Sequence, residues 1–239
     1  MTELTIIQQN DTHGQLQTHP ELFWRNGSPS YRRAGGFARI AAFVNKLRLD
    51  APNVLFADGG DLLHGTGPLL LSQGEVMIPL LRAMSIDVCV PGNWDFAYGF
   101  QQLKSLSKAL PFPLTALNLT SDSGDRIPMI PPYILKEYKD LKIGIIGLTY
   151  PYVHETMPGS FSEGLSFSLG VSELPDMISA LRTAEHADLI IVLSHMGLPL
   201  DAKLASQVDG IDLILSGHSH DRIAQPIVQN GCLIIQSGS

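Results

Sequence analysis

The chain has 239 residues, of which 44% are hydrophobic and 16% charged, and its formal net charge is −7. That length and apolar fraction provide for a sizeable buried core and exclude a disordered chain. The acidic balance argues against a nucleic-acid polymer as partner, and the longest apolar runs are too short to cross a bilayer. We therefore expect neither nucleic acid nor a membrane as a partner.

Short apolar runs typical of buried strands alternate with segments of helical periodicity along the whole chain. In chain order, strands are expected at residues 4–7, 54–57, 87–90, 114–117, 142–148, 189–193, 213–215 and 233–235. Helices are expected at residues 36–48, 73–84, 100–109 and 171–186. Residues 18–33 and 120–132 are rich in turn formers and are expected to be loops. This alternation predicts one α/β domain over residues 1–239.

Residue types that commonly bind metals follow five of the expected strands. They are Asp11, His13, Asp61, Asn93, His195, His218 and His220. In α/β sheets, ligands collect at the carboxyl ends of strands. Taken singly, an Asp or Asn after a strand is more often a turn former or helix cap, and a lone His is often a core residue. The combination, with neighbouring glycines that permit sharp turns, predicts a metal centre.

The ligand types also indicate which metals to expect. Mixed nitrogen and oxygen ligands suit Mn, Fe, Zn or Co better than calcium. Seven ligands are too many for one tetrahedral zinc, whereas they fit two ions that share a bridging carboxylate. We therefore expect two divalent metal ions, with Mn favoured over Zn, Fe or Co.

The order D-x-H, G-D, G-N-x-[D/E], H, G-H-x-H resembles that of the calcineurin-like metallophosphoesterases. The segments QNDTHGQLQ, GGFARI, GGDLLHGTG and QSGS look like the 5′-nucleotidase branch of that family. The resemblance implies an α/β sandwich of two β-sheets flanked by helices. It further implies a first metal held by Asp11, His13, Asp61 and His220, and a second held by Asp61, Asn93, His195 and His218.

Trp94 departs from the family pattern, in which a catalytic histidine follows the asparagine. That histidine is taken to stabilise phosphoryl charge and to help the leaving oxygen depart. An indole keeps one N–H donor but transfers no proton at ordinary pH. Ala97 stands where many relatives have an aspartate that supports the histidine. The context W-D-F-A-Y-G is similar to that in the thiosulfohydrolases of bacterial sulfur oxidation, which cleave sulfate from a cysteine-linked sulfane with two manganese ions.

The leaving group decides what Trp94 means for the chemistry. A thiolate, with a conjugate pKa near ~8.5, leaves without a proton, whereas an alkoxide gains about 10²–10⁴-fold from a general acid. Trp94 thus indicates either a leaving group that departs as a stable anion or another proton donor. Asp95 and His64 are the nearest candidates, the alternatives being a structural carboxylate and a polar loop residue. The predicted catalytic residues are Asn93, His195, Asp95 and Trp94.

The leading hypothesis is a metal-dependent hydrolase of small-molecule phosphoesters or nucleotides. It is of the 5′-nucleotidase or 2′,3′-cyclic nucleotide phosphodiesterase type, with a metal-bridging hydroxide attacking phosphorus in line. One alternative is thiosulfohydrolase-like cleavage of a sulfur-linked ester, which allows a carrier protein as substrate. Another is a weakly catalytic, metal-bearing binding domain, against which the complete ligand set argues.

The ends of the chain leave the compartment open. The opening Met1-Thr2-Glu3-Leu4 lacks the basic and apolar regions of a signal peptide, so a cytoplasmic protein and an exported one whose leader is missing here are both compatible. The two cysteines lie in apolar runs and predict no disulfide. Full-length members of the resembled branch carry a C-terminal domain that grips the nucleoside, and we expect that domain to be missing from this chain, which stops at Ser239.

Overall fold

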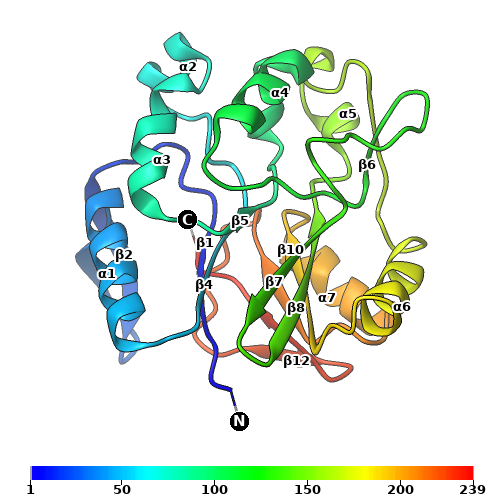
Figure 1. Cartoon of the computed structure of the whole chain (residues 1–239). Coiled ribbons are helices and arrows are strands. Elements are labelled where there is room, and N and C mark those ends of the chain that lie inside the picture. Colours follow the sequence, from blue (N-terminus) through cyan, green and yellow to red (C-terminus); the bar gives the residue numbers. More distant parts are fainter. Residues whose placement is uncertain (1, 239) are drawn as a thin grey trace.

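The computed structural model describes residues 2–238, and Met1 and Ser239 lie outside the described part. Two β-sheets pack face to face, with helices on their outer faces (Figure 1). The first sheet has three parallel strands in the order β1-β4-β5, namely β1 (Thr5–Gln9), β4 (Val54–Asp58) and β5 (Val88–Cys89). The second is a six-stranded sheet in the order β12-β13-β11-β10-β8-β7. Its strands are β7 (Tyr133–Tyr138), β8 (Leu141–Leu148), β10 (Leu189–Ser194), β11 (Leu213–Ser216), β12 (Ile227–Gln229) and β13 (Cys232–Ile235).

Helices and short accessory strands complete the chain. The helices are α1 (Phe37–Asp50), α2 (Gly67–Ser72), α3 (Ile78–Met84), α4 (Gly99–Ala109), α5 (Val153–Thr156), α6 (Leu174–Thr183) and α7 (Leu198–Gln207). Three single 3₁₀ turns are η1 (Glu75–Met77), η2 (Trp94–Phe96) and η3 (Gly159–Phe161). Two antiparallel pairs lie outside the main sheets, formed by β2 (Thr18–Arg25) with β3 (Ser28–Gly35) and by β6 (Leu119–Ser121) with β9 (Leu165–Phe167).

The core has three apolar clusters because successive side chains of a strand point to opposite faces. In β4, Leu55 faces the second sheet, in a cluster with Ile145 and Ile191, whereas Phe56 packs under α1, α3 and α4. Ile146 and Val192 face the other way and pack under α6 and α7. Both sheets are therefore buried on both faces, which explains the nearly uninterrupted apolar strands. The expected sandwich of two sheets flanked by helices is confirmed.

The parallel strands bring their carboxyl ends to a common edge of each sheet. In the first sheet Gln9 pairs with Asp58, and in the second Ser194 pairs with Ser216. The loops that leave β1, β4, β10 and β11 therefore begin side by side. These four loops carry six of the predicted metal ligands, and the loop after β5 carries the seventh, Asn93.

Most expected strands agree with the structure to within one or two residues, but one expected strand and one expected loop are wrong. Residues 114–117 form no strand and contribute one isolated bridge, between Leu114 and Cys89. Residues 18–33 form the β2–β3 hairpin instead of a loop. Its turn is Asn26-Gly27, and both residues have positive φ (49° and 76°), as the tight turn of a two-residue hairpin requires. The Asn-Gly pair is a typical hairpin turn, but the abundance of turn formers in residues 18–33 led to the prediction of a loop.

None of the helices within residues 2–238 is long and apolar enough to span a bilayer.

Gly147 in β8 tests how closely the second sheet is packed. A Cβ at this position would overlap the carbonyl group of Thr115, whereas a Cβ at Gly159 would meet nothing within 4 Å. We expect Gly147→Ala to lower the free energy of unfolding by about 1–3 kcal/mol through overpacking. Gly159→Ala should stay within about 0.5 kcal/mol of the natural protein. Denaturant unfolding of both variants checks this, and equal effects would show that the strand can shift at little cost.

Asp201 in α7 makes the free energy of unfolding depend on pH, and a substitution of this residue can isolate its contribution. Its carboxylate is fully buried and accepts a hydrogen bond from Ser194 Oγ at 2.6 Å, and burial raises its pKa from 3.8 to about 7. Between these values the folded chain holds a proton that the unfolded chain has released. The contribution of Asp201 to stability therefore falls as the pH rises through this window.

The Asp201→Asn variant has no carboxyl group at this position, so its stability lacks this fall with rising pH. The stability of the variant relative to the natural protein should rise between pH 3.8 and about 7 by up to about 1.4 kcal/mol per pH unit. Denaturant unfolding of both metal-free proteins across this range measures the difference. Parallel curves would mean that the buried carboxyl titrates normally.

Candidate metal centre

Asp11 and Asp61 lie in the loops that follow two neighbouring parallel strands, β1 and β4. Backbone hydrogen bonds tie the two loops together: Asp11 N–H donates to Gly60 O and His13 N–H donates to Asp61 O, both at 2.9 Å. Asp11 and Asp61 are each 2% exposed. The fold therefore buries two carboxylates at one edge of the first sheet.

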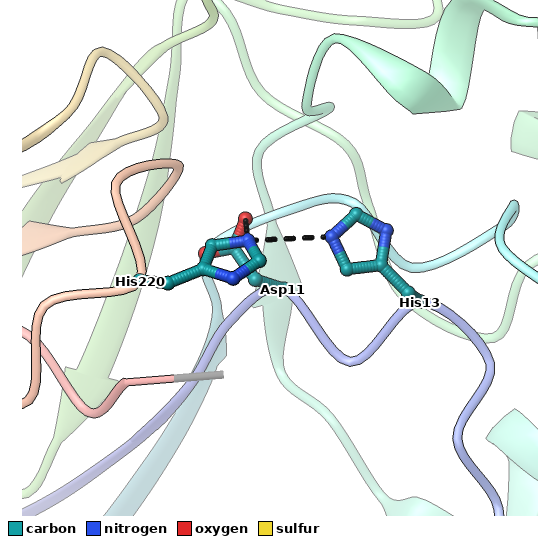
Figure 2. Close-up of side chains that lie close together, drawn as sticks. All are labelled: Asp11, His13 and His220. Atoms are coloured by element: carbon teal, nitrogen blue, oxygen red, sulfur yellow. Dashed lines mark hydrogen bonds and ion pairs between the residues drawn. The ribbon is translucent and has the colours of Figure 1, made fainter.

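The first group of ligand atoms belongs to Asp11, His13 and His220, which lie within 4.8 Å of one another (Figure 2). His220 Nε2 is 3.2 Å from Asp11 Oδ1 and 3.4 Å from His13 Nε2. Residues far apart in the sequence thus direct two ring nitrogens and one carboxylate oxygen towards the same point. Such an arrangement offers lone pairs to a shared cation.

The second group consists of Asp61, His195 and His218, whose ligand atoms also lie within 4.8 Å of one another. His195 Nε2 is 3.3 Å from Asp61 Oδ2. Asn93 Oδ1 lies 3.1 Å from His195 Nε2 and 2.9 Å from His218 Nδ1, so the amide oxygen joins this group. His195 is fully buried, and its Nδ1 contacts Gly59 O at 2.5 Å, which fixes the ring.

The two groups adjoin through their carboxylates. Asp61 Oδ2 lies 3.8 Å from His13 Nε2 of the first group, and Asp11 Oδ1 lies 3.8 Å from His195 Nε2 of the second. The structure thus brings all seven predicted ligand residues into one cluster. Asp11 Oδ1 is buried yet makes no hydrogen bond to residues 2–238, as a metal-binding oxygen would. The donor set fits two first-row divalent ions, and the assignment of individual ligands stays a prediction.

The backbone of the cluster is strained. Five of the seven predicted ligand residues have left-handed φ angles between 45° and 71°: Asp11, His13, Asp61, His218 and His220. This region is uncommon for residues other than glycine, and such residues persist where their surroundings hold them, often at functional sites. The concentration of strain here is an observation independent of the residue types.

Two glycines allow the ligand loops to approach one another. A Cβ at Gly92 would overlap the Asp61 carboxylate. Gly60 has a φ of 94°, and a Cβ there would collide with Gly92 N and approach the His195 ring. No larger residue fits at either position without moving the predicted ligands.

The buried carboxylates set the electrostatics of the cluster. Burial by itself would lower the pKa of His195, but Asp61 and Asp11 outweigh it and raise that pKa to about 10. The pKa of His218 falls to about 4, through burial and then through the charge of His195. In the metal-free chain the two carboxylates therefore hold a proton on His195, which a bound cation would displace, whereas His218 is already neutral, the form that binds metals.

Asp95 supports the loops of the metal cluster through hydrogen bonds to their backbone, and its carboxylate does not face the cluster. Its oxygens accept four backbone hydrogen bonds of 2.8–3.0 Å, from Asp61, Leu62, Leu63 and Gly92. The residue is 3% exposed. This geometry is at odds with the predicted catalytic role, because both oxygens are already occupied. Asp95 instead positions the loop that carries Asp61 and the turn that carries Asn93.

Trp94 lies at the rim of the cluster and is 36% exposed. Its backbone N–H donates to Asp61 Oδ1 at 2.8 Å, which fixes this residue against the predicted bridging carboxylate. The indole stacks on the ring of His64, and Phe161 approaches it edge-on at 5.9 Å. The position that a catalytic histidine takes in the family pattern is thus occupied here by part of an aromatic wall, formed by Trp94, His64 and Phe161.

Gln236 opens the QSGS segment, and the sequence analysis gave this residue no role of its own. It follows β13 and is 1% exposed. Its Nε2 donates to Ser216 Oγ (2.9 Å) and Gly217 O (2.8 Å), and its Oε1 accepts from the N–H of Asp221. One amide thus spans the loop that carries His218 and His220. A polar residue directly after an apolar strand was the available signal.

Removing this amide should loosen the loop. We expect Gln236→Ala to weaken Mn²⁺ binding about 10–100-fold, the effect typical of groups that support metal ligands. Calorimetric titration of the metal-free protein with Mn²⁺ measures it, with Gln229→Ala on the exposed strand β12 as the control. An unchanged dissociation constant would mean that the loop keeps its shape without Gln236.

A cavity of about 660 Å³ opens beside the first group of ligands, between β1, α1 and the β2–β3 hairpin. Asp11, His13 and His220 line it on one side. Among its lining atoms, Gln9 Oε1 and Thr12 Oγ1 are buried without hydrogen-bond partners in the described chain. The cavity therefore presents free polar groups next to the cluster.

Comparison with known proteins agrees with this geometry. Over 225 residues the chain is 30% identical to a 5′-nucleotidase of Bos taurus, covering 91% of this chain and 38% of that protein. It is 30% identical to an NAD 5′-nucleotidase of Haemophilus influenzae over 221 residues, again covering 91% of this chain and 36% of that protein. The chain thus spans well under half the length of these curated relatives.

Solved structures show the same architecture. The sulfate thiohydrolase SoxB of Thermus thermophilus superposes with a TM-score of 0.89 at 26% identity, covering 100% of this chain and 52% of that one. The NAD nucleotidase of Haemophilus influenzae gives a TM-score of 0.84 at 26% identity, covering 98% and 44%. The sequence profile named calcineurin-like phosphoesterase matches residues 4–222. The chain belongs to the calcineurin-like phosphoesterase family.

Proposed function

We propose that residues 1–239 form the catalytic domain of a hydrolase that cleaves phosphate esters of nucleotides, of the 5′-nucleotidase or 2′,3′-cyclic nucleotide phosphodiesterase type, with two bound divalent metal ions. The observation that carries the proposal is the pair of adjoining ligand groups, Asp11–His13–His220 and Asp61–His195–His218, with Asp61 between them. Two such ions, when bound, supply a hydroxide nucleophile at neutral pH and polarise the ester oxygens. Hydroxide bridging and in-line attack at phosphorus belong to the proposal.

The residues of this chain have distinct roles in that reaction. Asp61, as the proposed bridge, is held by the backbone N–H of Trp94 and by the turn that Asp95 organises. Asn93 lies between His195 and His218 and contributes an uncharged oxygen, which limits the negative charge that an incoming phosphate meets. The similarity to 5′-nucleotidases supports a nucleotide as substrate.

A second candidate is cleavage of a sulfur-linked ester, which includes a carrier protein among the possible substrates. Two observations favour it: Trp94 in place of the family histidine, and the likeness to a sulfate thiohydrolase at a TM-score of 0.89. The two candidates share the metal centre and differ in the leaving group. Substrate choice therefore separates them and metal content does not.

The test is release of phosphate or sulfate by the Mn²⁺-loaded chain. We expect phosphate from 5′-AMP or an adenosine monophosphate from 2′,3′-cyclic AMP, and a kcat/KM more than about 100-fold lower in Asp61→Asn, because a ligand matters more than the groups that support it. Asp176→Asn, at an exposed position of α6, is the matched control and should be unaffected.

Other outcomes decide between the hypotheses. Sulfate release from S-sulfocysteine without hydrolysis of either nucleotide would favour the sulfur-linked ester. Stoichiometric Mn²⁺ binding with no turnover of any of the three compounds would contradict both hydrolase proposals and favour a metal-bearing binding domain.

A further inference from the structure

Trp94 raises the question of which residue protonates an alkoxide leaving group, and the structure separates the two candidates. Asp95 is excluded because four backbone N–H groups occupy its carboxylate and it is 3% exposed. His64 is half-buried and lies in the loop between Asp61 and α2. Its imidazole stacks on the indole of Trp94, with ring centroids 4.7 Å apart and an interplanar angle of 15°.

The other histidines do not compete with His64. Four of the eight belong to the predicted ligand set. Of the rest, His19 lies in the hairpin and pairs with Glu21, and His154 and His186 are exposed. In residues 2–238, His64 is the only histidine recorded in ring contact with Trp94.

The backbone around His64 is fixed on both sides. The preceding residues, Leu62 and Leu63, donate their N–H groups to Asp95 Oδ1 at 3.0 and 2.8 Å. The following residue, Gly65, has a φ of 133°, and a Cβ there would overlap the backbone and Cβ of His13. His64 is therefore anchored between the loop that carries His13 and the buried carboxylate that organises Asp61.

The ring of His64 is fixed as well. Trp94 covers one face, and Tyr98 packs at a centroid distance of 5.5 Å. The charged or titratable groups that act on it are His13, Asp61 and the more distant hydroxyl of Tyr98. Burial lowers the pKa of His64, with His13 acting in the same direction and Asp61 opposing it. A protonated ring in such a place is a stronger acid than an exposed imidazolium.

We propose that His64 is the catalytic acid of this site and that Trp94 is the platform that holds it. This inference rests on the proposed phosphomonoesterase function. As the new P–O bond to the attacking hydroxide forms, the P–O bond to the leaving group breaks and its electron pair stays on the leaving oxygen. The imidazolium of His64 gives that oxygen its proton, so the product is an alcohol, and the ring regains a proton from solvent. The acid and its support thus come from two loops instead of one.

The test compares two leaving groups in the Mn²⁺-loaded whole chain. p-Nitrophenyl phosphate releases a phenolate that needs no proton, whereas 5′-AMP releases an alkoxide that does. We expect His64→Gln to lower kcat for 5′-AMP by about 10²–10⁴-fold, the usual contribution of a general acid, with KM little changed. Turnover of p-nitrophenyl phosphate should change by less than about 5-fold on the same reasoning.

Three further variants separate chemistry from folding. His186→Asn replaces an exposed histidine and should leave both rates unchanged. Trp94→Ala removes the platform and should lower turnover of 5′-AMP selectively, to a smaller extent than His64→Gln. The double variant His64→Gln/Trp94→His returns a histidine to the family position and should recover turnover of 5′-AMP. Thermal unfolding and Mn²⁺ content of each variant show whether the fold and metal centre are intact.

Each remaining outcome overturns a stated part of the argument. Equal loss on both substrates in His64→Gln, or no loss on 5′-AMP, would overturn the role of His64 and leave the phosphomonoesterase proposal standing. Turnover of p-nitrophenyl phosphate but not of 5′-AMP by the natural chain would do the same. No turnover of either ester by the natural chain would overturn the proposed function and the role of His64 together.

Discussion

The burial of two carboxylates, Asp11 and Asp61, at the ends of neighbouring strands is the constraint on which the rest of the site depends. Two negative charges held close together in a buried place are unfavourable unless positive charge or hydrogen-bond donors compensate them. The chain supplies imidazoles from the loop of Asp11 and from two further loops, and the backbone N–H groups of Trp94 and His218 donate to the two carboxylates. Asp11 Oδ1 accepts no hydrogen bond from the described residues and lies 3.2 Å from His220 Nε2, so the cluster keeps the attraction for a cation that a metal centre needs.

The same constraint explains the strained backbone of the cluster. Convergence of loops from two sheets on one point requires sharp turns, and five predicted ligand residues take left-handed conformations to achieve it. The strain is held by groups that do not face the cluster. Asp95 fixes the loop of Asp61 and the turn of Asn93, and Gln236 fixes the loop of His218 and His220. These two buried polar side chains thus hold the loops of the predicted ligands in place at the ends of the sheets.

The aromatic wall formed by Trp94, His64 and Phe161 shows how one departure from a family pattern can be accommodated. Replacing a histidine by tryptophan removes a proton donor, but the large flat indole provides a surface against which another imidazole can stack. The two candidate substrates, a nucleotide and a sulfur-linked ester, differ in the leaving group that would depart beside these aromatic rings. The metal centre itself is compatible with both.

The sequence by itself determined an α/β domain, most of its strands and the seven residues of the cluster, because buried parallel strands leave a plain apolar pattern and the polar residues after them stand out. The two-sheet sandwich was implied by the family resemblance and not by this pattern. The pattern did not give the β2–β3 hairpin, since the Asn26-Gly27 turn was obscured by the polar composition around it. Only the tertiary structure showed which backbone groups Asp95 and Gln236 hold and that His64 stacks on Trp94. Those contacts depend on which donors and rings lie across from each side chain, and loops distant in sequence supply them. Spacing along a chain carries no information about such contacts.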